Sequence, residues 1–227
     1  MALPKLDTPT FKLQIPSTGD TVSYRPFLVK EEKILLMARE SKNTNEVIET
    51  LQKLVSACVD DTDPKKLTTY DLEYIFMMLR SKSIGEELEI GIKCEECGEM
   101  VPVSINIEED IQITKTEMDS KIQLTPTVGV ILRHPTVEIV SGLNTEDPME
   151  VLVGCMESIY DETTVHNLQE YSKKEIKDFV DALSIKEVQK IQDYFEAMPK
   201  LTCDVKFTCP ACGHENTVRV EGLSNFF

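Results

Sequence analysis

LEIGIKCEECGEMVPVSINIEE at residues 88–109 and LTCDVKFTCPACGHENTVRVEG at residues 201–222 follow the same plan. Each stretch has an alternating, strand-like run, then Cys-x-x-Cys-Gly, then a second alternating run. The glycine supplies the backbone freedom that a tight turn needs if both sulfurs are to point the same way. The two stretches therefore predict two β-hairpins, each with a pair of cysteines at its tip.

The four cysteines at these tips are expected to bind one metal ion. Cys94 and Cys97 form one pair, and Cys209 and Cys212 form the other. Four thiolates in a tetrahedron are the closed arrangement that zinc prefers, with no open position for a substrate. We therefore expect one structural Zn2+ per chain, held by a split zinc ribbon that joins two distant parts of the chain.

Other readings of the cysteines remain open at this stage. A redox pair is disfavoured because thioredoxin-like chemistry places Cys-x-x-Cys at the start of a helix, whereas strands flank both pairs here. An iron–sulfur cluster would also accept four cysteines. His214 could replace one thiolate, and Cys203 could be a core residue or a neighbour of the site. Cys58 and Cys155 lie in helical patterns and are expected to be buried.

The second half of the chain repeats the order of elements in the first. Each half has a short strand ending at Arg and Pro, an amphipathic helix, a helix with a hydroxyl residue three before an acid, and a cysteine hairpin. The paired stretches are 22–27 with 130–137, 44–62 with 146–163, 67–83 with 183–199, and 88–109 with 201–222. An extra helix is expected at about 172–182. Chance recurrence of unrelated αβ stretches is the alternative to duplication.

This repeat sets the expected fold class and domain organisation. We expect an α+β protein of two pseudo-repeated halves, residues 1–110 and 111–227, joined through the zinc ribbon into one compact unit. Within the repeat, the run Val59–Thr62 is aligned with Tyr160–Thr163, because each has an apolar residue, two acids and a threonine.

Charge and composition exclude several classes of protein. The 227 residues carry 40 acidic and 24 basic side chains, a net charge of −16, which disfavours binding to nucleic acid phosphates. No apolar run approaches the ~18 residues of a membrane span, and the first residues lack the pattern of a secretory signal. Seven cysteines without such a signal favour a reducing compartment. The acidic surface either keeps the protein soluble or binds a basic partner protein.

No catalytic pattern stands out along the chain. The three histidines, His134, His166 and His214, lie outside any nucleophile or metalloprotease motif, and no glycine-rich phosphate loop is present. The clustered carboxylates are typical of solvated surfaces and helix ends. The sequence therefore indicates a binding or structural protein rather than an enzyme.

The N-terminal stretch 9–41 carries a family resemblance. Physically it predicts a β-hairpin with a polar turn at Ser17–Asp20, then a helix beginning near Lys30. The segments that carry the resemblance are Pro16–Gly19, Tyr24–Phe27, Glu31–Lys33 and Leu35–Leu36. They resemble the N-terminal signature of the T4-type bacteriophage baseplate hub assembly protein family, and the size, acidity and two cysteine knuckles of the chain also fit that family.

The resemblance implies a late phage protein that acts in assembly of the baseplate hub. Its expected partners are hub and tape-measure proteins, with no nucleic acid, membrane or small-molecule substrate, and it would act in the host cytoplasm during assembly. Retention in the virion is left open, as is a role as a tail assembly chaperone. A zinc-ribbon adaptor for transcription or translation machinery is the alternative from another class.

Four residues of the signature are candidates for partner binding. They are Arg25, Pro26, Phe27 and Lys30. Their other expected role is to anchor the N-terminal hairpin on the following helix. The resemblance supplies no catalytic residues.

Overall fold

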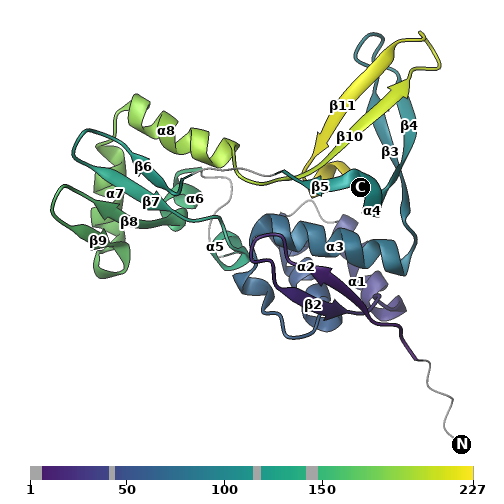
Figure 1. The fold of residues 1–227 in the computed structure, drawn as a ribbon, viewed down its shortest axis with the longest axis horizontal. Helices are drawn as coiled ribbons and strands as arrows, with labels where there is room; N and C mark the ends of the chain where they lie inside the picture. The colour runs from purple at the N-terminus through teal and green to yellow at the C-terminus, as the bar shows by residue number, and fades with distance from the viewer. Residues whose placement is uncertain (1–6, 41–43, 115–118, 142–147, 227) are drawn as a thin grey trace, which may run out of the picture. The chain divides into compact units, whose positions relative to one another are not determined.

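A computed structural model describes residues 7–40, 44–114, 119–141 and 148–226, and its mixture of helices and small antiparallel sheets confirms the α+β class (Figure 1). Contacts divide the chain into two compact units. The first unit comprises Met1–Thr114 and Lys200–Phe227, and the second comprises Lys115–Pro199. The second unit is an insertion into the first, since the Thr114 N–H donates to the Lys200 carbonyl at 2.9 Å where the chain leaves and returns.

The first unit contains a helical layer and two long hairpins. Its elements are β1 (Phe11–Gln14), β2 (Thr21–Tyr24), α1 (Val29–Glu40), α2 (Thr44–Cys58), the 3-10 turn η1 (Pro64–Lys66), α3 (Thr69–Ser83), β3 (Glu87–Lys93), β4 (Met100–Asn106), α4 (Ile107–Asp110), β5 (Ile111–Ile113), β10 (Leu201–Thr208), β11 (Glu215–Glu221) and the 3-10 turn η3 (Leu223–Phe226).

Helix α3 organises the core of the first unit. It begins at a capping box in which the Thr68 hydroxyl and backbone exchange hydrogen bonds with Asp71. Asp71 is fully buried and also accepts the Ser17 N–H at 2.9 Å, so the same carboxylate holds the turn between β1 and β2. The helix packs against α2, α4 and β10, and burial of its apolar side chains, Ile75 and Leu79 among them, provides the main driving force for this packing.

Two antiparallel sheets carry the cysteine hairpins. Strands β3 and β4 form one hairpin, and the other sheet has the order β11-β10-β5. Inward side chains alternate along β3, where Leu88, Ile90 and Ile92 are buried. Strand β10 also pairs with β5, with Cys203 opposite Ile111. This pairing joins strands that are about 90 residues apart in sequence and fixes the second hairpin within the first unit.

The second unit is a small antiparallel sheet with helices packed on it. Its elements are β6 (Lys121–Gln123), β7 (Gly129–Leu132), α5 (Val137–Ser141), α6 (Pro148–Cys155), β8 (Met156–Tyr160), β9 (Val165–Asn167), the 3-10 turn η2 (Leu168–Glu170), α7 (Lys173–Asp181) and α8 (Ile185–Glu196). The strand order is β6-β7-β8-β9. Val130, Leu132, Leu152, Val180 and Ile191 belong to its buried core, which therefore draws on the sheet and on α6, α7 and α8.

Some expected elements differ from the observed ones. Of the helix expected over 146–163, residues 146–147 lie outside the described residues, and the helix ends at Cys155. Residues Met156–Tyr160 form strand β8 instead, because hydrogen bonding to β7 outweighs the helical pattern of this short stretch. His166 lies in β9. The helix expected at about 172–182 is α7.

The division of the chain also differs from the expected halves 1–110 and 111–227. The second cysteine hairpin lies in the same unit as the first, whereas residues 115–199 form a unit of their own. Within the described parts of the chain, no helix combines the length and apolarity that crossing a membrane would require.

Candidate metal centre

The two cysteine turns are built alike. In the first turn, the Cys94 N–H donates to the Glu99 carbonyl at 2.8 Å, and the Gly98 N–H donates to the Cys94 carbonyl at 2.9 Å. In the second turn, the same two bonds join Cys209 with His214 and Gly213 with Cys209, both at 2.9 Å. Gly98 and Gly213 have φ of 75° and 76°, a left-handed conformation in which a side chain is strained.

The tips of the two hairpins bring the four cysteine sulfurs together. All four Sγ atoms lie within 4.8 Å of one another. Cys94 Sγ lies 3.7 Å from Cys212 Sγ, and Cys97 Sγ lies 3.6 Å from Cys209 Sγ. These separations exceed a disulfide bond of about 2.05 Å. They match the edge of a zinc tetrahedron, which is about 3.8 Å for Zn–S bonds of about 2.3 Å. The donor set therefore fits a single tetrahedral metal ion.

Burial divides the four ligand candidates into two pairs. Cys94 and Cys209 are 2% and 1% exposed and belong to a small apolar cluster with Val101, against which Val103 and Phe207 pack. Cys97 and Cys212 are exposed at the surface. An ion among them would have a dry, apolar floor and a rim open to solvent.

The thiols of the cluster perturb one another. The Cys97 N–H donates to the sulfur of Cys94 and is the main cause that lowers the pKa of Cys94 to about 6. The His214 N–H favours the Cys212 thiolate, but desolvation and the three neighbouring thiols outweigh it and raise the pKa of Cys212 to about 12. The four groups therefore do not all ionise by themselves at neutral pH. A divalent cation would supply the charge that four thiolates need.

A buried asparagine lies beside the cluster, and no sequence motif predicted its place there. Asn216 in β11 is 2% exposed, and its amide nitrogen lies 3.6 Å from Cys94 Sγ. Its amide oxygen accepts the Glu95 N–H at 3.0 Å, so it links the second hairpin to the first turn. The sequence does hold one signal for it. Asn216 is polar, whereas the equivalent residue of the first hairpin, Val101, is apolar.

The other cysteines and His214 lie outside the cluster. Cys203 is buried in β10, and Cys58 and Cys155 are buried at the ends of α2 and α6. Burial raises the pKa of Cys155 and of Cys203 to about 11, so both are kept as neutral thiols. His214 contributes its backbone carbonyl to the turn, and the cluster of metal-binding candidates found among the described residues does not include its ring.

The candidate partner-binding residues divide into inward and outward ones. Arg25 donates to the Pro26 carbonyl at 2.9 Å, to the Ala57 carbonyl at 2.8 Å and to the Glu31 carboxylate at 3.0 Å. Phe27 is buried. Lys30 is the one exposed residue of the four, with a side chain that is 73% exposed. These contacts favour the anchoring role for Arg25 and Phe27.

Burial of Glu31 opposes its ionisation, but hydrogen bonds from the Leu28 N–H, Arg25 and Lys30 outweigh the burial and lower its pKa. The carboxylate accepts the Leu28 N–H at 2.8 Å at the start of α1. It therefore connects Arg25 to the first turn of α1 and holds the N-terminal hairpin on that helix.

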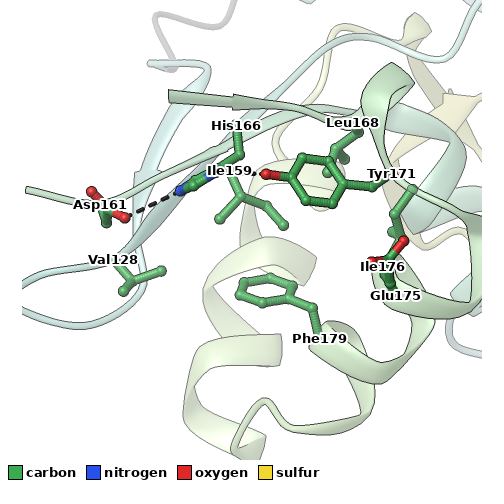
Figure 2. A pocket seen from close by; sticks show the side chains of 9 residues that line it. All are labelled: Val128, Ile159, Asp161, His166, Leu168, Tyr171, Glu175, Ile176 and Phe179. Carbon is green, nitrogen blue, oxygen red and sulfur yellow. Dashed lines mark hydrogen bonds and ion pairs between the residues drawn. The ribbon is translucent and has the colours of Figure 1, made fainter. Parts of the chain in front are cut away.

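A separate pocket of about 370 Å3 lies within the second unit (Figure 2). Its apolar walls include Val128 and Phe179. His166 at its edge has Tyr171 Oη 2.8 Å from Nδ1 and an Asp161 oxygen 3.1 Å from Nε2. N–H groups of the Asp161–Thr164 turn and the His166 ring lower the pKa of Asp161. Both ring nitrogens are thus engaged by Tyr171 and Asp161, and within the described parts of the chain neither has a hydrogen bond to a serine or cysteine nucleophile of the kind that acyl transfer requires.

One comparison with known proteins found a match. The family model described as T4 bacteriophage base plate protein matches residues 8–227, which is nearly the whole chain. No match was found among the curated proteins or among the solved structures.

Proposed function

The chain belongs to the T4 bacteriophage base plate protein family, and from this premise we propose that it is a non-catalytic component of the baseplate hub of a contractile tail, fastened by one structural zinc ion. The observation that carries the proposal is the closed group of four sulfurs at the joined tips of two hairpins. Such a site offers no open coordination position for a substrate. Its role is to hold a scaffold whose outer surfaces bind other tail proteins.

Zinc is the metal that the donor set supports best. Four thiolates in a tetrahedron select zinc or iron–sulfur chemistry. A cluster of several irons would place sulfurs bound to different irons further apart than 4.8 Å, because the atoms of the cluster lie between them, whereas here all four sulfurs lie within 4.8 Å of one another. A single ion at the centre of the four sulfurs needs no rearrangement.

Matching hydrogen bonds in the two units support an internal duplication. The Arg25 N–H donates to the Cys58 carbonyl at 2.9 Å, and the Arg133 N–H donates to the Cys155 carbonyl at 2.9 Å. Each guanidinium also donates to the carbonyl one residue before that cysteine, at 2.8 and 3.3 Å. In both cases a strand ends at the residue before the arginine, and the arginine bonds to the end of a helix. Two unrelated αβ stretches would have no reason to share this set of bonds.

The same comparison revises the register of the repeat. Val59 and Met156 are equivalent, because each follows the helix and pairs with the residue before the arginine. Next, Asp63 and Asn167 each cap a 3-10 turn, and five residues later Thr68 and Ser172 each open a capping box. Helix α7 thus corresponds to α3, and the additions in the second copy are α8 and the extra residues between Met156 and Asn167.

Partner binding is proposed for the exposed start of α1. Leu28 and Val29 are exposed apolar residues, and Lys30 beside them is exposed as well. Pro26 and the inward Arg25 hold this segment in place. Hub or tape-measure proteins are the proposed partners, and the net charge of −16 favours basic segments of them over nucleic acid. The protein would meet them in the host cytoplasm during assembly.

Two related roles differ in whether the protein is present in the finished virion. As a hub component it remains in the finished baseplate, and as a tail assembly chaperone it leaves before the virion is complete. The third candidate, a zinc-ribbon adaptor for transcription or translation machinery, would bind polymerase or ribosome. Membership of the base plate family favours the first two.

The test is affinity capture of the tagged full-length chain from infected cells, together with analysis of purified tails. We expect hub or tape-measure proteins to co-purify and the chain to be present in purified tails. Capture of tail proteins without presence in tails would support the chaperone. Recovery of polymerase or ribosome without any tail protein would contradict the baseplate proposal. Elemental analysis should find close to one zinc per chain, and two ions per chain would overturn the shared site.

A further inference from the structure

The buried amide of Asn216 makes polar contacts to both cysteine turns. Its oxygen accepts the Glu95 N–H at 3.0 Å. Its nitrogen lies 3.6 Å from Cys94 Sγ and donates to the His214 carbonyl at 3.1 Å. Burying an amide is costly unless its hydrogen bonds are made, and here both ends of the amide have partners. The bonds to Glu95 and His214 therefore join the first turn to the second in addition to the contact with Cys94.

The equivalent position on the other side of the cluster is apolar. Counted from the first cysteine of each turn, Asn216 corresponds to Val101, and Glu95 corresponds to Pro210. Pro210 has no N–H to donate, and Val101 has no oxygen to accept one. Val101 is buried in the apolar cluster with Cys94 and Cys209. The two turns are thus matched in backbone but linked by a polar contact on one side alone.

From this arrangement we propose that Asn216 is a positioning residue for the metal centre. It holds Cys94 Sγ in the ligand position by donating to it, and it fastens the Glu95 backbone so that the first turn stays aligned with the second. This inference rests on the proposed metal site. Groups that hydrogen-bond metal ligands typically change metal affinity by 10–100-fold when they are removed.

Loss of Asn216 should act mainly on the first turn. Cys94 is buried, so its sulfur is shielded from reagents while the turns stay aligned. Without the amide, the Glu95 N–H loses its partner and the first turn opens more often. The metal should then dissociate faster, and Cys94 should become accessible during these openings. If Asn216 merely filled space, its loss would lower the stability of the whole unit without this selective effect on Cys94.

The experiment compares the full-length metal-loaded protein with Asn216→Val, which mirrors Val101, and with Asn216→Asp, which retains an acceptor for the Glu95 N–H but loses the donor to sulfur. The control is Thr217→Val, the same kind of change at the exposed neighbour on β11. Zinc release to a chromogenic chelator should be about 10–100-fold faster for Asn216→Val and unchanged for the control. Release from Asn216→Asp should also be faster, because it lacks the bond to Cys94.

Two further readouts separate positioning from general stability. Alkylation with iodoacetamide, mapped by mass spectrometry, should show a selective rise at Cys94 in Asn216→Val. Cobalt-substituted protein should show a red shift of the sulfur-to-cobalt charge-transfer band, because the thiolate loses a donor. Unchanged zinc release and Cys94 alkylation in a variant that is merely less stable would overturn the proposal.

Amide exchange at Glu95 tests the proposal independently of metal. In metal-free wild-type protein the Glu95 N–H should exchange more slowly than in metal-free Asn216→Val, and the Thr217→Val control should match wild type. If wild-type protein holds no metal, the proposed zinc site fails, while the exchange result still decides whether Asn216 links the turns. Equal exchange in wild type and Asn216→Val would refute the link even if zinc is bound.

Discussion

Replacement of Cys97 by serine in the full-length chain is the most direct test of the proposed zinc site. Cys97 is exposed, so the change itself removes little packing, yet its sulfur lies 3.6 Å from Cys209 Sγ across the two hairpins. Serine is a poor zinc ligand and leaves three thiolates. We expect the first unit to lose stability and the chain to lose zinc.

The magnitude follows from the length of chain that the ion would close. Cys97 and Cys209 are 112 positions apart. The entropy relation for a cross-link gives about 5 kcal/mol for a loop of that length. If the second unit stays folded, its ends already meet at the Thr114–Lys200 hydrogen bond, and the flexible loop shrinks to roughly 25 residues, worth about 3.5 kcal/mol. A loss of about 3.5–5 kcal/mol lowers Tm by roughly 7–20 °C in a chain of this size.

Calorimetry with elemental analysis measures both effects. Wild-type protein treated with a chelator should match Cys97→Ser, whereas Glu96→Ser, an exposed change in the same turn, should leave Tm and zinc content unaltered. The transition of the second unit serves as an internal control, because its core contains none of the four cysteines. If Cys97→Ser retains one zinc per chain and melts with wild type, the structural role of the site is wrong.

Three further predictions concern stability. Burial raises the pKa of Glu73 to about 7 despite a hydrogen bond from the Leu223 N–H. The folded-state pKa is thus above the unfolded value, so the penalty is absent below about pH 4.5 and complete above about pH 7. Glu73→Gln should therefore match wild type near about pH 4 and exceed it by up to about 3 kcal/mol near about pH 8, measured by denaturant unfolding. Gly129→Ala should cost about 1–3 kcal/mol, because the added Cβ would lie 2.6 Å from the Ile122 carbonyl oxygen. Arg25→Lys should cost about 2 kcal/mol, because a lysine ammonium cannot keep the bond to buried Glu31 together with those to the Pro26 and Ala57 carbonyls.

Each of these predictions has a contrary outcome. A stability difference between Glu73→Gln and wild type that does not vary with pH would show that the carboxyl is not desolvated. An unchanged unfolding midpoint for Gly129→Ala would contradict the close approach of the strands there. Arg133→Lys is the matched control for Arg25, since its guanidinium makes one longer bond of 3.3 Å among the residues that the structure describes. An equal loss in both variants would refute the contribution assigned to Glu31.

Local patterns in the sequence were sufficient for several features. The Cys-x-x-Cys-Gly turns depend on a few adjacent residues, and the φ values of Gly98 and Gly213 follow from the need to turn sharply there. The capping box at Thr68 and Asp71 likewise depends on residues three apart, and it lies where the pattern predicted it. Helices and strands with a strong period were found from sequence for the same reason, because the signal lies within one or two turns of chain.

Other features depend on contacts between distant segments. Met156–Tyr160 continues a helical pattern but forms a strand, because β7 offers it a hydrogen-bonding edge. Pairing of β10 with β5 places both cysteine hairpins in one unit and leaves residues 115–199 as an insertion. The role of Asn216 depends on the Glu95 amide, 121 positions away. The two cysteine turns and the sulfurs they carry follow from local sequence, because they depend on neighbouring residues. That the four sulfurs meet was expected because one zinc ion needs four ligands, but the residues that align them depend on packing between distant segments that no local period encodes.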